Sequence, residues 1–339
     1  MADDETDKYA IAKGAGLRLW ADTEKAYSRR RCGSGFAVLD EEGQKVADRV
    51  RERIDDLVIP PAWTEVRICP NPKGHLQATG RDAAGRKQYL YHPDWHEAVR
   101  RHKFADLAEF GESLGDLRER IDSDLRRRTP GIDRTVALAV ALIDRTGIRV
   151  GSPEYTRDNE THGLTTLLKP HLHLGKTYAR FCYEGKAHQP RDLRVNGRRW
   201  ARHLERMKAT PGDRLMRYRS TPGWCDLDGG QINDYLQRFA SGSPSAKRFR
   251  TWIGSLVAFI EVQRQQATES STKRVAQAAV RRAASVLGNT IAVCREHYIH
   301  PAVLRTPLEA VTTESAADDL RRDDLLAAEP QLLSLLHAC

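Results

Sequence analysis

Paired cysteines are missing from this sequence of 339 residues. Its 6 cysteines are scattered, with no CxxC pair and no histidine at the spacing of a zinc site. They are Cys32, Cys69, Cys182, Cys225, Cys294 and Cys339. Neither a disulfide framework nor a zinc site is therefore indicated, and reduced thiols fit a cytoplasmic protein best.

Long apolar runs are missing as well. No stretch approaches the roughly 18 to 20 apolar residues that cross a bilayer, and the amino terminus is acidic and polar. The sequence has no GxxxxGK[ST] phosphate loop and no cluster of carboxylates of the kind that holds magnesium. We therefore expect no membrane partner, no use of ATP, and no metal or other cofactor.

Positive charge is what the sequence has in excess. Lysine and arginine number 55 against 46 aspartates and glutamates, which gives a net charge of +9. Such an excess most often serves a polyanionic partner or a solvated surface. The stretch 307–339 reverses the sign, because its acids outnumber Arg321 and Arg322. We expect this acidic tail to face away from any nucleic acid.

Two domains are expected, because the chain exceeds the size at which one hydrophobic core usually stops growing. In the first domain, residues 1–98, the apolar spacing of 46–57 predicts a helix that ends before Pro60 and Pro61. Short strands between turn-rich segments are predicted at 66–69, 75–79 and 88–91. The first domain is therefore predicted to be small and rich in β-structure.

The second domain, residues 99–339, shows helical periodicity. The predicted helices are a linker helix through Trp95 and Phe104, a stretch through Leu117 and Leu125, and the segments 136–147, 198–207, 230–239, 246–263 and 272–287. Alternation at 177–183, followed by Glu184-Gly185-Lys186, predicts a small β-hairpin. The fold class is thus α+β, with a larger, mainly α-helical domain.

A tyrosine near the carboxyl end of this basic helical domain is a candidate nucleophile. Tyr298 stands in the segment CREHYIHP, 294–301. A tyrosine hydroxyl that attacks a phosphodiester forms a phosphotyrosine ester and divides a difficult transfer into two reversible steps. Taken alone, a tyrosine is more often simply packed in a core.

Phosphoryl transfer needs mainly cations and a proton donor, so arginines and a lysine are the expected companions. Arg149 lies between Gly147 and Gly151, which would let the backbone approach a ligand closely. Arg250 lies at the start of a predicted helix, where amide donors and a guanidinium could share a phosphate. Lys186, at the hairpin tip, could protonate a leaving alkoxide. Each of these, taken singly, is more often a solvated surface charge.

Taken together, several segments form a specific pattern. They are PPAW (60–63), GHLQATGRD (74–82), GRKQYLYH (85–92), NETHGLTTL (159–167) and CREHYIHP (294–301). In this order they resemble the hallmarks of the poxvirus-like and bacterial type IB DNA topoisomerases, and the resemblance extends from about residue 17 to 305. It implies a catalytic core of the topoisomerase IB and tyrosine recombinase type.

The resemblance also implies the chemistry. Tyr298 would be the nucleophile, forming a 3′-phosphotyrosyl link, and Lys186 the general acid that expels the 5′-hydroxyl. Arg149 and Arg250 would stabilise the transition state. The family commonly has a histidine nine residues before the nucleophile, where this sequence has Asn289. An asparagine amide can still donate a hydrogen bond to a phosphate oxygen, although it carries no charge, so we expect activity to be retained.

DNA contacts are expected in both domains. They are, by resemblance, Gln88, Tyr89, Tyr91 and Tyr155 and, by charge, Arg67. Strand alternation would put Tyr89 and Tyr91 on one face, which without the resemblance is more typical of a core. The basic runs 29–31 and 126–128 could add phosphate contacts, although such runs are usually solvated faces.

Two other functions share these features. A tyrosine recombinase would use the same arginine, lysine and tyrosine chemistry in a tetramer, but the N-terminal segments disfavour it. A basic DNA-binding protein without catalysis would leave Tyr298 packed and bind phosphates in a salt-sensitive manner. The favoured interpretation is a monomeric, cytoplasmic, nucleoid-associated topoisomerase that relaxes supercoiled double-stranded DNA without ATP.

Overall fold

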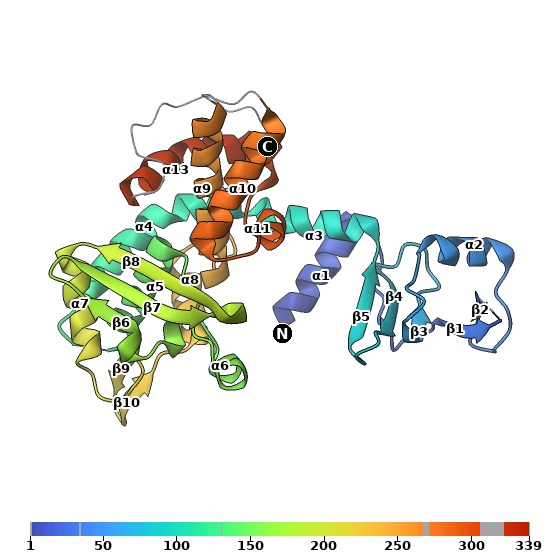
Figure 1. Ribbon diagram of the computed structural model, residues 1–339, viewed down its shortest axis with the longest axis horizontal. Coiled ribbons are helices and arrows are strands. Elements are labelled where there is room, and N and C mark those ends of the chain that lie inside the picture. The colour runs from blue at the N-terminus through green and yellow to red at the C-terminus, as the bar shows by residue number, and fades with distance from the viewer. Residues whose placement is uncertain (1, 34, 130, 267–270, 306–321, 339) are drawn as a thin grey trace. The chain divides into compact units, whose positions relative to one another are not determined.

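The computed structural model describes residues 2–33, 35–129, 131–266, 271–305 and 322–338 (Figure 1). The chain divides into two compact units, Met1–Ala105 and Asp106–Cys339. The boundary expected near residue 98 lies inside helix α3 (Pro93–Ala105), which belongs to the first unit. Together the units form an α+β protein.

An antiparallel sheet of five strands, in the order β2-β1-β3-β4-β5, forms the centre of the first unit. The strands are β1 Tyr27–Cys32, β2 Gly35–Leu39, β3 Thr64–Ile68, β4 Leu76–Arg81 and β5 Lys87–Tyr91. The last three confirm the predicted strands. β1 and β2 were not predicted, because the basic run 29–31 occupies most of β1 and is typical of a solvated surface.

Three helices accompany this sheet: α1 Ala2–Gly14, α2 Asp48–Asp56 and α3. α2 packs Ile54 into a buried cluster with Ile68 of β3 and Ala78 of β4. It begins later than the apolar spacing predicts, because Ala47 is still extended, at φ −61° and ψ 151°. α3 packs Trp95 against Leu17, beyond the end of α1.

The second unit is mainly helical, as the periodicity predicts (Figure 1). Its α-helices are α4 Leu107–Leu125, α5 Ile132–Thr146, α6 Pro153–Asn159, α7 Arg198–Lys208, α8 Gly229–Phe239, α9 Ala246–Gln266, α10 Thr272–Leu287, α11 Ile291–His297, α12 Pro301–Arg305 and α13 Arg322–His337. α9 is buried along most of its length and packs against α5, α10, α12 and α13. Among the described helices, none is long and apolar enough to cross a membrane.

Two small sheets interrupt these helices. One has the order β6-β7-β8, and the other pairs β9 with β10. Their strands are β6 Leu172–Leu174, β7 Tyr178–Gly185, β8 Gln189–Asn196, β9 Arg217–Ser220 and β10 Gly223–Asp226. β7 and β8 confirm the predicted hairpin, whose tip is a short 3-10 turn, Lys186–His188. β6, β9 and β10 were not predicted.

The C-terminal helix α13 is held by partly buried ion pairs around the buried Asp144. Arg118 of α4 contacts Glu329 of α13 at 2.7 Å and Asp144 of α5 at 3.0 Å. Arg322 of α13 also pairs with Asp144. The first part of the expected acidic tail, 307–321, lies outside the described residues. In its remaining part, Glu329 faces the interior of the unit rather than solvent.

Candidate active site

Tyr298 is held in place by the end of α11 and by one face of α9. As the C-terminal cap of α11 it donates its amide hydrogen to the carbonyl oxygen of Cys294 at 2.9 Å. A Cβ atom added at Gly254 would overlap the Tyr298 carbonyl oxygen, so glycine permits the close approach of α9. Beside it, Ser255 Oγ accepts a hydrogen bond from the His300 amide at 2.9 Å. α9 therefore fixes the backbone around Tyr298.

Arg250 extends from the same face of α9 toward the ring of Tyr298. Its Cζ atom lies 5.0 Å from the ring centroid. The guanidinium donates hydrogen bonds to the carbonyl oxygens of Gly147 and, at 3.0 Å, of Leu287. Arg250 is only 3% exposed, so the interpretation of this residue as a surface charge is wrong.

Arg149 reaches the same place from the loop after α5. Gly147 ends α5 in the left-handed conformation at φ 62°, which turns the chain away from the helix axis. Arg149 Nη2 donates to the Gly288 carbonyl at 3.1 Å and to Asn289 Oδ1. Arg250 Nη2 donates to the same Oδ1 at 3.2 Å. The side chain of Asn289 therefore joins two guanidinium groups.

We call the group of Arg149, Arg250, Asn289 and Tyr298 the arginine pocket. Burial lowers the pKa of Arg250 to about 10, and the charge of Arg149 adds to this effect. Burial likewise lowers the pKa of Arg149. In the described part of the chain neither guanidinium has a carboxylate partner, and Arg250 Nε and Asn289 Nδ2 are buried without a hydrogen-bond acceptor. An anion with several acceptor oxygens would relieve both the charge and the unsatisfied donors.

Gly151, one of the two glycines near Arg149, packs closely against another segment of the backbone. A Cβ atom at Gly163 would lie 2.5 Å from the Gly151 nitrogen, so the two backbones touch. Beside them, the Leu164 amide donates to the Arg149 carbonyl at 2.8 Å. The segment 159–167 thereby fixes the loop that carries Arg149.

Lys186 is exposed at the tip of the β7–β8 hairpin. Its Nζ atom lies 5.8 Å from the ring centroid of Tyr155, which is on α6 and 41% exposed. The structure thus brings the other expected catalytic residues together and places Lys186 beside Tyr155.

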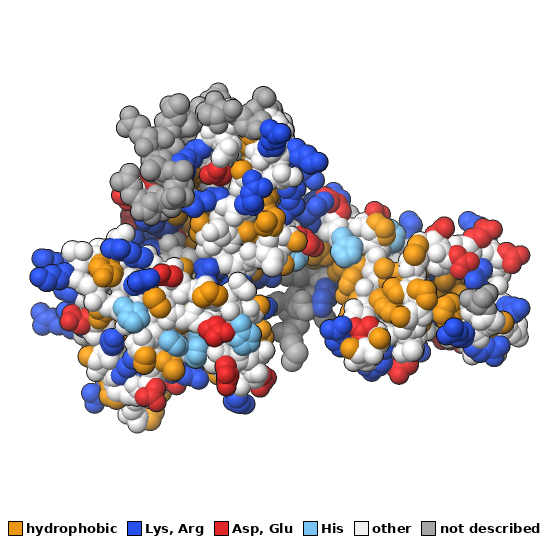
Figure 2. All heavy atoms as spheres, in the orientation of Figure 1, with side chains coloured by type: hydrophobic (Ala, Val, Ile, Leu, Met, Phe, Trp, Pro, Cys, Tyr) orange, Lys and Arg blue, Asp and Glu red, His pale blue; other side chains and the backbone are white. Residues whose placement is uncertain are grey.

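The expected DNA contacts of the first unit are not equivalent. Tyr89 and Tyr91 stack at 6.2 Å on one face of β5, as alternation predicts, and Tyr89 is 49% exposed. Arg67 is exposed and shares a cross-strand row with Tyr89 through Thr79. Figure 2 shows hydrophobic side chains gathered over β4 and β5. Gln88 instead donates a hydrogen bond to Asp82 at 2.9 Å.

One arginine of each basic run is engaged within the protein. Arg29 donates to three carbonyl oxygens of the segment 59–63 at 2.8 to 3.0 Å. Arg127 pairs with Asp124 at 2.9 Å and with Asp133 at 2.6 Å. Arg29 thus holds the backbone of this segment, and phosphate contacts by the runs stay a prediction.

One charged residue near the pocket was missed by sequence reasoning. Arg191 of β8 donates from Nη2 to the Val286 carbonyl oxygen at 3.0 Å, across 95 residues of sequence. It lies directly opposite Tyr183 in the β7–β8 register. The alternation of residues along β8 is the signal in the sequence that places Arg191 on one face of the hairpin. Alternation cannot predict that its partner is the carbonyl oxygen of Val286.

Comparison with known proteins agrees with this site. Residues 93–318, more than half of the chain, match the family described as "Eukaryotic DNA topoisomerase I, catalytic core". Residues 35–82 match "Bacterial DNA topoisomerase IB, N-terminal domain". The DNA topoisomerase 1B of Acanthamoeba polyphaga mimivirus is 27% identical over 271 residues, which cover 76% of this chain and 79% of that protein. The first match includes the entire arginine pocket.

Proposed function

Because this chain belongs to the type IB DNA topoisomerases, we propose that its arginine pocket links DNA transiently to Tyr298. The enzyme is an isomerase, and its substrate is DNA. One observation carries the proposal. Two guanidinium groups, the buried one of Arg250 and the half-buried one of Arg149, share the Asn289 side chain beside a tyrosine and have no carboxylate partner among the described residues.

In the cleavage step the Tyr298 hydroxyl oxygen attacks the scissile phosphorus and its proton passes to water. A bond forms between that oxygen and phosphorus, and the bond between phosphorus and the 5′-oxygen breaks. Lys186 supplies the proton that the leaving 5′-oxygen takes up. Religation reverses these steps, with the 5′-hydroxyl as the nucleophile. The phosphotyrosyl bond keeps the energy of the phosphodiester, so neither ATP nor a metal ion is required.

The arginines stabilise the charge that develops on the non-bridging phosphate oxygens. Arg149 and Arg250 are already held by carbonyl oxygens, so little reorganisation accompanies the reaction. Arg250 Nε and Asn289 Nδ2 are the buried donors left for a phosphate oxygen. Asn289 then contributes a hydrogen bond and positions both cations, without adding charge.

The substrate in this proposal is double-stranded DNA, acted on by a monomer in the cytoplasm. The predicted N-terminal domain, residues 1–98, would contact the duplex through Tyr89 and Arg67, which are exposed and share one cross-strand row of the sheet. Tyr91 and Gln88 are half-buried, and we assign them a supporting position. Tyr155, next to Lys186, would contact DNA near the cleavage site.

The test is relaxation of supercoiled plasmid in EDTA without ATP, with SDS added to trap covalent complexes. The wild type is expected to relax the plasmid and form an adduct at the 3′ end. Tyr298→Phe should do neither, whereas Tyr9→Phe, at a tyrosine that is 62% exposed in the first unit, should behave as the wild type. Plasmid binding without relaxation or adduct would contradict the proposal and leave a non-catalytic DNA-binding protein.

A further inference from the structure

Arg191 connects the hairpin that carries Lys186 to the turn that carries Asn289. From β8 its Nη2 atom donates to the carbonyl oxygen of Val286 in the last turn of α10 at 3.0 Å. Its guanidinium also fills the space beside Gly288, where an added Cβ atom would overlap it. Gly288 ends α10 in the left-handed conformation at φ 60°. Arg191 therefore packs directly on the residue before Asn289.

The other side of Arg191 faces its own hairpin. Tyr183 of β7 is its cross-strand neighbour, close enough for the charge of Arg191 to act on its hydroxyl. Tyr183 is only 9% exposed, and burial raises the pKa of its hydroxyl, while the charge of Arg191 opposes that rise. The tyrosine is thus a fixed, neutral partner. One guanidinium spans two elements that are far apart in sequence.

The hairpin tip needs such an anchor. Lys186 is exposed on a flexible four-carbon stem, and the two residues after it, Ala187 and His188, have φ of 61° and 54°, which side chains seldom adopt. A general acid must come within hydrogen-bond reach of its oxygen, about 2.6 to 3.2 Å. A loss of about 1 Å in alignment can cost on the order of 100-fold in rate. A residue that fixes the hairpin against the α10–α11 turn therefore controls how well Lys186 can protonate the leaving 5′-oxygen.

We propose that Arg191 is a positioning residue for DNA cleavage, holding the β7–β8 hairpin against the 286–288 turn so that Lys186 meets the leaving 5′-oxygen. The inference rests on the proposed function. Arg191 acts through Lys186 and does not contact the phosphate, because its Nη2 donor is directed to Val286 and its guanidinium packs on Gly288. The charge of Arg191 also contributes to lowering the pKa values of Arg149 and Arg250. The alternative to be distinguished is therefore a direct electrostatic role.

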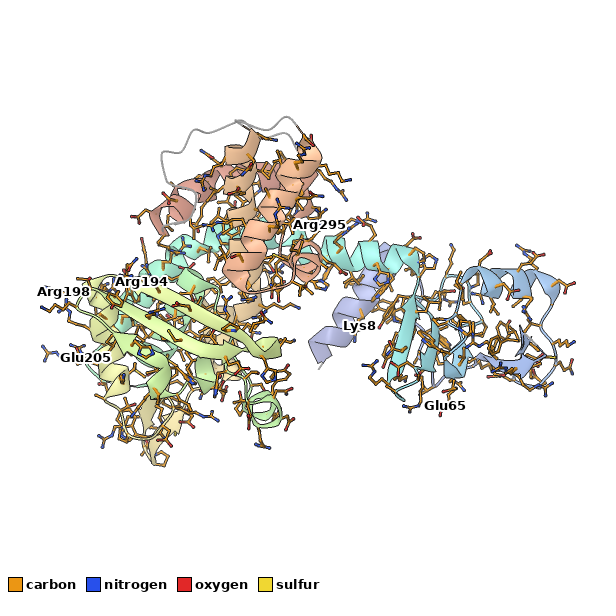
Figure 3. All side chains as sticks on the ribbon, viewed as in Figure 1. Lys8, Glu65, Arg194, Arg198, Glu205 and Arg295 are labelled. Atoms are coloured by element: carbon orange, nitrogen blue, oxygen red, sulfur yellow. The ribbon has the colours of Figure 1, made fainter. Side chains whose placement is uncertain are left out.

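A substrate that needs no general acid separates the two roles. The substrate is a duplex with sulfur in place of the bridging 5′-oxygen. Its cleaved 5′ end leaves as a thiolate. Because thiols have a pKa of about 8.5, this departure needs no proton donor. Two variants of Arg191 are compared. Arg191→Met removes both the charge and the planar set of guanidinium donors, whereas Arg191→Lys keeps only the charge. Lys186→Met is the reference. Arg194→Met is the matched control, because Arg194 lies on the exposed face of β8 (Figure 3), where its side chain contacts Asn196 and the ring of Tyr178 rather than the 286–288 turn.

Single-turnover cleavage of the oxygen substrate by Arg191→Met should fall by about 10- to 100-fold. On the sulfur substrate the defect should shrink to within about 3-fold, as for Lys186→Met, because the proton is no longer limiting. Arg191→Lys should stay defective, since an ammonium cannot span both partners. DNA affinity, measured in the Tyr298→Phe background, should stay within about 3-fold.

The proposal is overturned if Arg191→Met cleaves the oxygen substrate as the wild type does, or if it is equally slow on both substrates. The second result would place Arg191 among the cations of the transition state. Thermal denaturation of each variant shows that the compared proteins are folded. Failure of the proposed function would give a different result. Either the wild type would form no adduct, or Lys186→Met would cleave the sulfur substrate with the same defect as the oxygen substrate.

Discussion

Two regions of the second unit differ in how they compensate the charge of an arginine, which is half-buried in one region and buried in the other. Arg118 lies between Asp144 and Glu329. Burial alone would lower its pKa, but its hydrogen bonds to Glu329 and the charge of Asp144 raise it. Arg250 has no such partner in the described ranges, and burial together with Arg149 lowers its pKa to about 10.

This difference separates structure from chemistry. A buried cation with its counter-ions is already satisfied and can only hold elements together, as Arg118 holds α4 to α13. A buried cation without a counter-ion costs free energy until an anion arrives. The two regions meet on α9, because Trp252 donates to Glu329 at 3.1 Å two residues after Arg250. The paired region thus supports the helix that carries the unpaired one.

Removing a cation from the arginine pocket should have the largest effect. Arg250→Met is expected to lower single-turnover cleavage by about 1,000-fold, or roughly 4 kcal/mol, because an electrostatic donor to the phosphate is lost. Its thermal stability should not fall in proportion, since an uncompensated buried charge is removed with it. Lys247→Met, at an exposed position of α9, is the matched control. Near-normal cleavage by Arg250→Met would remove this residue from the chemistry.

Breaking the paired region should affect stability instead. Arg118→Met leaves Asp144 and Glu329 without a shared cation, and the free energy of unfolding should fall by about 3 kcal/mol. Urea denaturation measures this change. Cleavage by the remaining folded protein should stay within a few-fold of the wild type. A selective loss of cleavage with unchanged stability would contradict the division between the two regions.

Giving the arginines of the pocket a carboxylate partner is a sharper test of the difference between the two regions. Asn289→Asp places a carboxylate where the amide oxygen now accepts from both guanidinium groups. Cleavage should fall by about 100-fold, because the carboxylate neutralises the cations and repels the phosphate. Thermal stability should hold or rise. Asn289→Ala, which adds no charge, should lose less activity. Equal losses in the two variants would show that charge at this position is unimportant.

The smallest expected effect concerns acid. Burial alone would raise the pKa of Asp144, but the charges of Arg322 and Arg118 lower it. A carboxyl group whose pKa is depressed in the folded state stabilises the fold at pH values above its pKa in the unfolded chain, which is about 4. This contribution is lost as the pH falls below that value. Unfolding free energy measured from pH 6 downward should therefore decline more steeply in the wild type than in Asp144→Asn. Parallel declines would show that another group controls acid stability.

Much of the fold could be predicted because the relevant signals are local. α9 and α10 were predicted at 246–263 and 272–287, against Ala246–Gln266 and Thr272–Leu287 in the structure. Their apolar spacing and polar entries lie within each helix. β1 was missed because Arg29 packs over the ring of Phe36, at 4.1 Å, instead of facing solvent. A partner from another strand decides that choice.

The candidate site divides in the same way. The motifs pointed to Tyr298, Arg149 and Arg250 as one set, and the structure brings them together. The burial of Arg250 without a carboxylate and the grip of Arg191 on Val286 depend on contacts between distant segments. No periodicity or motif encodes such contacts, so only the folded chain reveals them.

The most direct test of the account is the chemical identity of the trapped adduct. Wild-type protein, cleaving a duplex oligonucleotide in EDTA, is denatured, digested with protease and nuclease, and analysed by mass spectrometry. The account predicts a nucleotide linked through its 3′-phosphate to the peptide that contains Tyr298, and no such peptide from Tyr298→Phe. An adduct on another residue, or one that persists in Tyr298→Phe, would contradict it.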